Sequence, residues 1–150
     1  MYHHTVGSNA VMELDFAVDR TGNIDPRHAA RYAEFGAWIR GCYGTPVAAA
    51  GWALGSSVVL EVPGGGVEID RVAVMEDISR GQRITEYTVE VQGRKGGDWL
   101  PFSVGTAVGH KRIDVVAPGG AAVAVRVTIS DGVELPANIS LAVFAPCSAV

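Results

Sequence analysis

Short runs of alternating apolar and polar residues occupy the chain from Val47 onward, and turn residues separate each run from the next. The most regular run is Ala122–Ser130, in which branched apolar residues alternate with small or polar ones. A period of two is typical of a strand with one buried face. About seven such runs, with a turn roughly every 8 to 12 residues, predict an antiparallel β-sandwich.

The other predicted strands are Val58–Val62, Val67–Met75, Ile84–Gln92, Trp99–Val104, Ile113–Val116 and Ile139–Phe144. Glycine-rich or polar turns join them, for example the tip formed by residues 93–98. The segment Ala48–Ser57 is apolar and rich in alanine and glycine. We interpret it as a short loop that leads into the sandwich.

One strand and one helix are predicted ahead of the sandwich. In Val11–Val18, apolar side chains alternate with carboxylates, which indicates a strand. Asp25 followed by Pro26 is typical of a helix N-cap with proline at the first helical position. The helix is expected to continue to Arg40, because the glycines that follow favour its end.

The fold class is therefore all-β, with a strand–helix segment over residues 1–45 and a sandwich over residues 46–150. The 150 residues are 48% hydrophobic and 19% charged, which favours a well-packed globule over a disordered chain. A net charge of -4 argues against nucleic acid as a partner. No window is apolar enough for a membrane span, and the start lacks the pattern of a signal peptide. The sequence does not indicate the cellular compartment of the protein.

Four stretches of the chain carry a resemblance to a known family. They are the N-terminal run YHHTVGSNAVMELDFAVDRTGNI, the helical stretch that ends in WIRGCYGT, and the segments Met75–Ile84 and Val104–Ile113, which pair glycine with clustered charge. Together they resemble the C-terminal region of family 29 α-L-fucosidases. The resemblance implies the last strand of a (β/α)8 barrel, then a helix, then a jelly-roll-like sandwich of the discoidin, or galactose-binding-like, kind.

The resemblance leaves the chain without a catalytic residue. Such a barrel needs about 250 residues, which this chain is too short to supply. The family's nucleophile is an aspartate upstream of everything matched here, and Glu13, Asp15 and Asp19 lie where the family usually has an Asn-x-x-Pro-like pattern. We therefore expect no catalysis by the isolated chain. No cofactor is expected, and the four histidines lack the spacing of a metal site.

Glu76, Asp77 and Arg83 lie in the first of the two charged segments, at a strand end. Carboxylates and arginine make charge-assisted hydrogen bonds to sugar hydroxyls, so these residues are candidates for carbohydrate binding. The alternative is that Arg83 binds a carboxylate or carbonyls within the module and fixes the loop. We favour this structural role, since the resembling enzymes carry the same residues in this segment whether or not a sugar is bound.

His110, Lys111 and Arg112 form the second charged cluster. They either bind an anionic glycan or protect a strand edge from aggregation. Two tryptophans are candidate platforms for stacking a sugar ring. Trp99 lies beside Leu100 and Phe102, so we assign it to the core, whereas Trp52 in the apolar entry segment is the better platform.

Cys42 and Cys147 are the only two cysteines, and they bracket the predicted sandwich. The resemblance implies that they form a disulfide, because discoidin modules bring their two ends together and often link them. Two buried thiols are the alternative. A disulfide would close a loop of about 105 residues and would contribute roughly 4 to 5 kcal/mol in the chain-entropy model.

Three functions agree with these observations. The chain is predicted first as a non-catalytic accessory or assembly module within a larger complex. It is alternatively a lectin-like carbohydrate-binding module, or the C-terminal fragment of an active α-L-fucosidase. The predicted strand Val11–Val18 favours a protein partner, because a lone strand leaves its backbone groups unpaired until another strand joins it.

Overall fold

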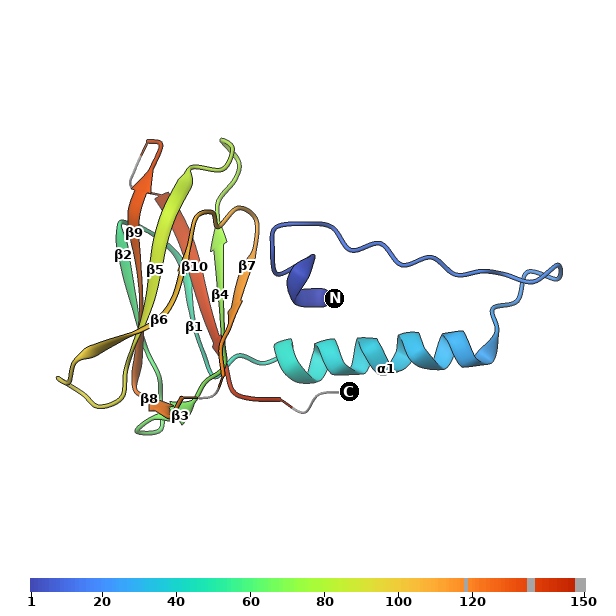
Figure 1. Cartoon of the computed structure of the whole chain (residues 1–150), viewed down its shortest axis with the longest axis horizontal. Coiled ribbons are helices and arrows are strands. Elements are labelled where there is room, and N and C mark those ends of the chain that lie inside the picture. Colours follow the sequence, from blue (N-terminus) through green and yellow to red (C-terminus); the bar gives the residue numbers. More distant parts are fainter. Residues whose placement is uncertain (118, 135–136, 148–150) are drawn as a thin grey trace.

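The structure is a computed structural model that describes residues 1–117, 119–134 and 137–147, and the side chains of all these residues except Trp52. It consists of two facing four-stranded sheets with one helix beside them (Figure 1). The first sheet has the order β1 (Ala48–Gly55), β10 (Ala137–Phe144), β4 (Arg71–Glu76), β7 (Arg112–Val115). The second has the order β2 (Ser57–Glu61), β9 (Ala124–Gly132), β5 (Ile84–Gln92), β6 (Trp99–Gly105).

A two-stranded ribbon of β3 (Val67–Glu68) and β8 (Ala121–Ala122) closes one end of the sandwich. Every strand pair in the three sheets is antiparallel. The predicted all-β sandwich with one helix is thus confirmed.

The main core fills the space between the two sheets. Its most buried members come from the central strands of both sheets, where the alternation predicted from the sequence turns every second side chain inward. They include Val72 and Val74 of β4, Tyr87 and Val89 of β5, Val125 and Val127 of β9, and Ile139 and Leu141 of β10. Burial of these side chains is the main driving force for folding.

Two strand predictions differ from the structure. Ala48–Ser57 is not a loop: its first eight residues form β1, which pairs with β10 at the edge of the first sheet. Alanine and glycine give this strand no alternation that a sequence pattern can reveal, and a register shift between Ala50 and Ala53 interrupts it. The run Val67–Met75 is divided at Ile69 and Asp70 into β3 and β4, which belong to different sheets.

The predicted strand Val11–Val18 is wrong for this structure. The segment is extended, but within the described chain it pairs with no strand and makes only an isolated bridge from Val18 to Ile24. The alternation of side chains correctly indicated an extended backbone. A strand, however, also needs a neighbouring strand to accept and donate its hydrogen bonds. The segment instead lies along the helix, away from the sandwich (Figure 1).

The helix α1 (Pro26–Tyr43) begins as predicted, with Asp25 accepting a hydrogen bond from the Arg27 backbone N–H at 2.8 Å. It runs one turn of chain further than predicted and ends at Gly44, whose N–H donates to the Arg40 carbonyl. Its apolar side chains build a second core against the outer surface of the first sheet. Members of this core are Tyr2, Phe35, Trp38, Ile39, Tyr43, Ala73, Ile113 and Phe144. Residues 1–45 and the sandwich are therefore packed together.

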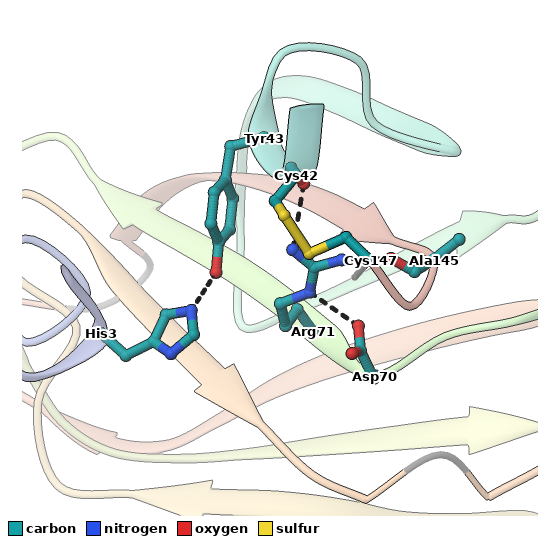
Figure 2. Close-up of a disulfide and its surroundings, with 7 residues drawn as sticks. All are labelled: His3, Cys42, Tyr43, Asp70, Arg71, Ala145 and Cys147. Atoms are coloured by element: carbon teal, nitrogen blue, oxygen red, sulfur yellow. Dashed lines mark hydrogen bonds and ion pairs between the residues drawn. A yellow bond between two sulfur atoms is a disulfide. The ribbon is translucent and has the colours of Figure 1, made fainter. Parts of the chain in front are cut away.

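A buried arginine joins the helix to the sandwich (Figure 2). Arg71, whose side chain is 2% exposed, donates to the Asp70 carboxylate at 2.7 Å and to the Cys42 carbonyl at 3.1 Å. It also donates to the Ala145 carbonyl and lies over the ring of Tyr43. One guanidinium thus connects the end of α1, strand β4 and the segment that follows β10.

The disulfide between Cys42 and Cys147 lies beside this arginine and links two of these three parts, the end of α1 and the segment that follows β10 (Figure 2). It bridges a sequence separation of 105 residues.

In the described residues no helix has both the length and the apolar character that crossing a membrane requires.

Replacing both cysteines by serine is expected to lower the free energy of unfolding by about 2–5 kcal/mol, because the unfolded chain regains the entropy of a long open loop. Urea denaturation of the double variant and of the unreduced protein measures the difference. Adding a reductant should lower the stability of the original protein only. Equal stability of the two proteins without reductant would contradict a stabilising crosslink.

Candidate functional site

The two charged segments singled out in the sequence lie at one end of the sandwich, where β4 leads into the loop 77–83 and the loop 106–111 leads into β7. Glu76 is fully buried at this junction. Its Oε1 accepts the backbone N–H groups of Arg83 and Ile84 at 2.6 and 3.2 Å, and its own N–H donates to the Gly109 carbonyl. Glu76 therefore closes the first loop onto the second and is not exposed to a ligand.

Asp77 and Arg83 also bind the protein itself. The carboxylate of Asp77 accepts the Ser79 N–H at 3.0 Å, and the hydrogen bonds from Ser79 lower the pKa of Asp77. Nη1 of Arg83 reaches the Glu134 carbonyl at 3.4 Å. Among the described residues, Arg83 Nε and Glu76 Oε2 are buried without a hydrogen-bond partner, and no ion pair joins the two side chains. The structural role favoured for Arg83 agrees with its contact to a carbonyl.

Asn9 connects the two loops, and the sequence analysis missed it. Its Oδ1 accepts the His110 N–H at 2.7 Å, its N–H donates to the Lys111 carbonyl at 2.9 Å, and its Nδ2 donates to Gln82 Oε1 at 3.4 Å. The asparagine has a positive φ of 61°, and Gly109 packs so closely against its amide that a side chain at 109 would collide. Asparagine is the residue most tolerant of this conformation after glycine, and that is the signal that could have indicated it.

The three cationic candidates do not act as one cluster. The side chain of His110 is exposed, and neither it nor Lys111 makes a side-chain hydrogen bond with the described residues. Arg112 instead points its Nε to Asp114 Oδ1 at 3.0 Å. Of the three, Arg112 therefore takes part in a side-chain hydrogen-bond network.

Asp114 is buried at the centre of that network. Its Oδ2 accepts the hydroxyl groups of Tyr87 at 2.8 Å and Ser103 at 2.7 Å, while Oδ1 accepts Arg112. Burial, reinforced by the negative charge of Asp114, raises the pKa of Tyr87, so its phenol is neutral. The bond to Asp114 raises the pKa of Arg112. These four residues tie β5 and β6 of one sheet to β7 of the other.

The two tryptophan predictions have different outcomes. The assignment of Trp99 to the core is wrong, since Trp99 is half-exposed and belongs to neither core cluster. Its ring lies 4.4 Å beneath the guanidinium of Arg126, which is paired with Glu90 at 2.6 Å across the sheet. Trp52 lies in β1, and its side chain is outside the described residues, so its role as a sugar platform stays a prediction.

No metal site is evident in the described residues, where no three His, Cys, Asp or Glu side chains gather as ligands. The buried carboxylates found there are Glu76 and Asp114, and both hold loops or strands together as described above. The arrangement is a cluster of loops that these hydrogen bonds stabilise.

Two of the solved structures that share this architecture carry the name α-L-fucosidase. A protein from Bacteroides thetaiotaomicron assigned to that activity is 30% identical to the chain, with a TM-score of 0.89 over 97% of the chain and 33% of its own length. Another from Bacteroides ovatus is 27% identical, with a TM-score of 0.81 over 98% of the chain and 26% of its own length. The chain therefore spans a third or less of these proteins.

A chitosan-binding module of a Paenibacillus chitosanase/glucanase shares the sandwich fold, with a TM-score of 0.50 and 15% identity over 63% of the chain and 74% of the module. No protein-family model matches the chain, and no curated protein matches it. The class that the fold defines is a β-sandwich with a leading helix, as found in family 29 fucosidases.

Glu76→Ala is expected to lower the free energy of unfolding by about 1–3 kcal/mol or more, because two buried N–H groups lose their acceptor. The matched control is Glu86→Ala, since Glu86 is exposed on β5 and has no side-chain hydrogen bond. Urea denaturation of both variants measures the difference. If both variants lower the free energy of unfolding by the same small amount, the Glu76 carboxylate does not hold the loop.

Tyr87→Phe tests the Asp114 network through its pH dependence. The folded protein favours the neutral phenol, so the raised pKa of Tyr87 gives stability that is present below the unfolded pKa of about 10 and is lost as the pH rises above it. Near pH 8 the free energy of unfolding of the variant should be lower than that of the original protein by about 1–3 kcal/mol. Between about pH 10 and pH 11 the free energy of unfolding should fall less steeply for the variant than for the original protein. Parallel slopes in urea titrations would contradict the prediction.

Proposed function

We propose that the chain is a non-catalytic supporting module of an α-L-fucosidase-type protein, in which α1 and the extended segment 11–18 dock onto a barrel supplied by another part of the protein or by a partner subunit. The observation that carries this proposal is the unpaired segment 11–18. Similarity to the two Bacteroides structures supports it, because the chain corresponds to only part of each.

One face of the segment is held by the helix. The Phe16 ring lies 3.7 Å from the Tyr32 ring, and the Tyr32 hydroxyl donates to the Asp15 carbonyl at 2.9 Å. Leu14 and Phe35 line a common apolar hollow. The even-numbered side chains thus face α1, as the side chains of a strand face the helix that covers it in an α/β unit.

Within the described chain no strand covers the other face of the segment. Its backbone is engaged by the bridge from Val18 to Ile24 and by the Tyr32 hydroxyl on the Asp15 carbonyl. Val11 on this face is 90% exposed. An extended segment that no neighbouring strand pairs with is a template for pairing with another strand. A parallel sheet that received it would pair with its backbone and use α1 as its covering layer. Glu13 and Asp15 on the odd-numbered face would then need polar partners from that sheet.

Carbohydrate binding is the second candidate. It is supported by the sandwich fold shared with the chitosan-binding module and by the exposed side chain of His110 at the rim, beside the half-buried Lys111. The rim candidates Glu76, Asp77 and Arg83 support it less, since each is engaged by the protein.

The size of the native protein tests the proposal. An antibody raised against residues 57–147 should detect in the source organism either a polypeptide longer by about 250 residues or more, the size of a barrel, or a 15.7 kDa chain that elutes with a larger assembly. Gel filtration followed by immunoblotting separates these outcomes. A free 15.7 kDa monomer would contradict the proposal.

The isolated chain should not hydrolyse 4-nitrophenyl α-L-fucoside, whereas the native form detected by the antibody should. Turnover by the isolated, pure chain would contradict a non-catalytic role.

A further inference from the structure

The edge strands β6 and β7 of the two sheets border an open hollow of about 450 Å³ beside the N-terminal residues. Its walls come from three parts of the chain that are distant in sequence. They are His3, His4 and Ser8 near the N-terminus, Ser103 and Val104 of β6, and Arg112–Val115 of β7. Its volume lies in the range of about 300–1,000 Å³ that is typical of small-ligand sites.

The N-terminal residues are fixed in this position. The Ile113 N–H donates to the Gly7 carbonyl at 2.9 Å, and Ser8 forms a β-bridge with Arg112, so this stretch covers the edge of β7. Ser8 Oγ donates to the His3 carbonyl, and His3 Nε2 shares a hydrogen bond with the Tyr43 hydroxyl. The wall opposite β6 is therefore preformed.

Arg112 is the fixed charge of the hollow. Its side chain is 37% exposed, and its Nε is committed to Asp114. The Tyr87 hydroxyl lies beside the same guanidinium and helps to raise the pKa of Arg112. The exposed part of a guanidinium that is held by a buried carboxylate can still donate to an anion, and carboxylates and sulfates accept such N–H groups.

The carboxylate of Asp114, unlike the guanidinium of Arg112, is not available to a ligand. Both of its oxygens already accept hydrogen bonds, from Tyr87, Ser103 and Arg112, and its side chain is 5% exposed. No other carboxylate lines the hollow among the described residues. An anion at Arg112 therefore meets no exposed negative group.

The remaining walls suit a sugar ring better than a bare ion. The hydroxyls of Ser8 and Ser103 each have lone pairs left to accept from a ligand, and the exposed ring of His4 offers a further polar contact. Val104, which is 72% exposed, offers an apolar surface. We propose that this hollow binds a saccharide through a carboxylate or sulfate group held by Arg112. This inference is separate from the supporting role proposed above.

The test is a titration of the isotopically labelled chain followed by NMR and calorimetry. The probes are methyl glucuronide and glucose 6-sulfate, with methyl glucoside as the neutral sugar and inorganic sulfate as the bare anion. We expect both acidic sugars to shift the amides of Ser8, Ser103 and Arg112 saturably and to bind more tightly than either control. Equal binding of methyl glucoside would overturn the role of the anion, and equal binding of sulfate would overturn the role of the sugar. No binding by the acidic sugars, or shifts confined to residues 110–111, would overturn the site.

Variants separate the site from the general charge of the protein. Arg112→Gln should weaken the binding of both acidic sugars about tenfold or more. Arg94→Gln makes the same charge change on an exposed hairpin tip and should leave the affinity unchanged. His4→Glu provides an independent test, because it adds a negative charge to the wall without touching the Asp114 network, and it should also weaken binding. Unchanged affinity in folded Arg112→Gln or His4→Glu would overturn the proposal.

Discussion

The buried guanidinium of Arg71 is the interaction on which the arrangement of helix and sandwich depends. A charge out of water is costly unless its hydrogen bonds are satisfied. Here the Asp70 carboxylate and the carbonyls of Cys42 and Ala145 satisfy it, and the Tyr43 ring covers one side. Because these partners come from three separate stretches, the charge is satisfied only when the helix end, β4 and the last described segment are all in place.

This junction explains how one chain carries two cores. The core between the sheets folds around branched side chains of the central strands. The second core is built from aromatic side chains of α1 and the N-terminus, which pack on the outer surface of β4, β7 and β10. The supporting role proposed above depends on this rigidity, since a helix fixed to the sandwich would present the segment 11–18 in one orientation to a receiving sheet.

The sequence indicated the parts of the fold that depend on local pattern. The alternation in β5 and β9 and the capped start of α1 are strong signals because the side chains that produce them are the ones that become buried or bonded. The edge strand β1 escaped prediction because alanine and glycine carry no such pattern. Segment 11–18 has the pattern of a strand, but pairing is decided by what lies next to it. The link through Asn9 and the network around Asp114 join residues up to 101 positions apart, so no short motif reveals them.

The disulfide also determines how the module bears mechanical load. Cys42 lies at the end of α1 and Cys147 follows β10, so the crosslink sits where the chain enters and leaves the sandwich. Tension transmitted between the helix and the chain beyond Cys147 passes through the sulfur–sulfur bond and bypasses all ten strands. The sandwich is thereby shielded from pulling forces that would otherwise unzip β1 and β10 from its edge inward.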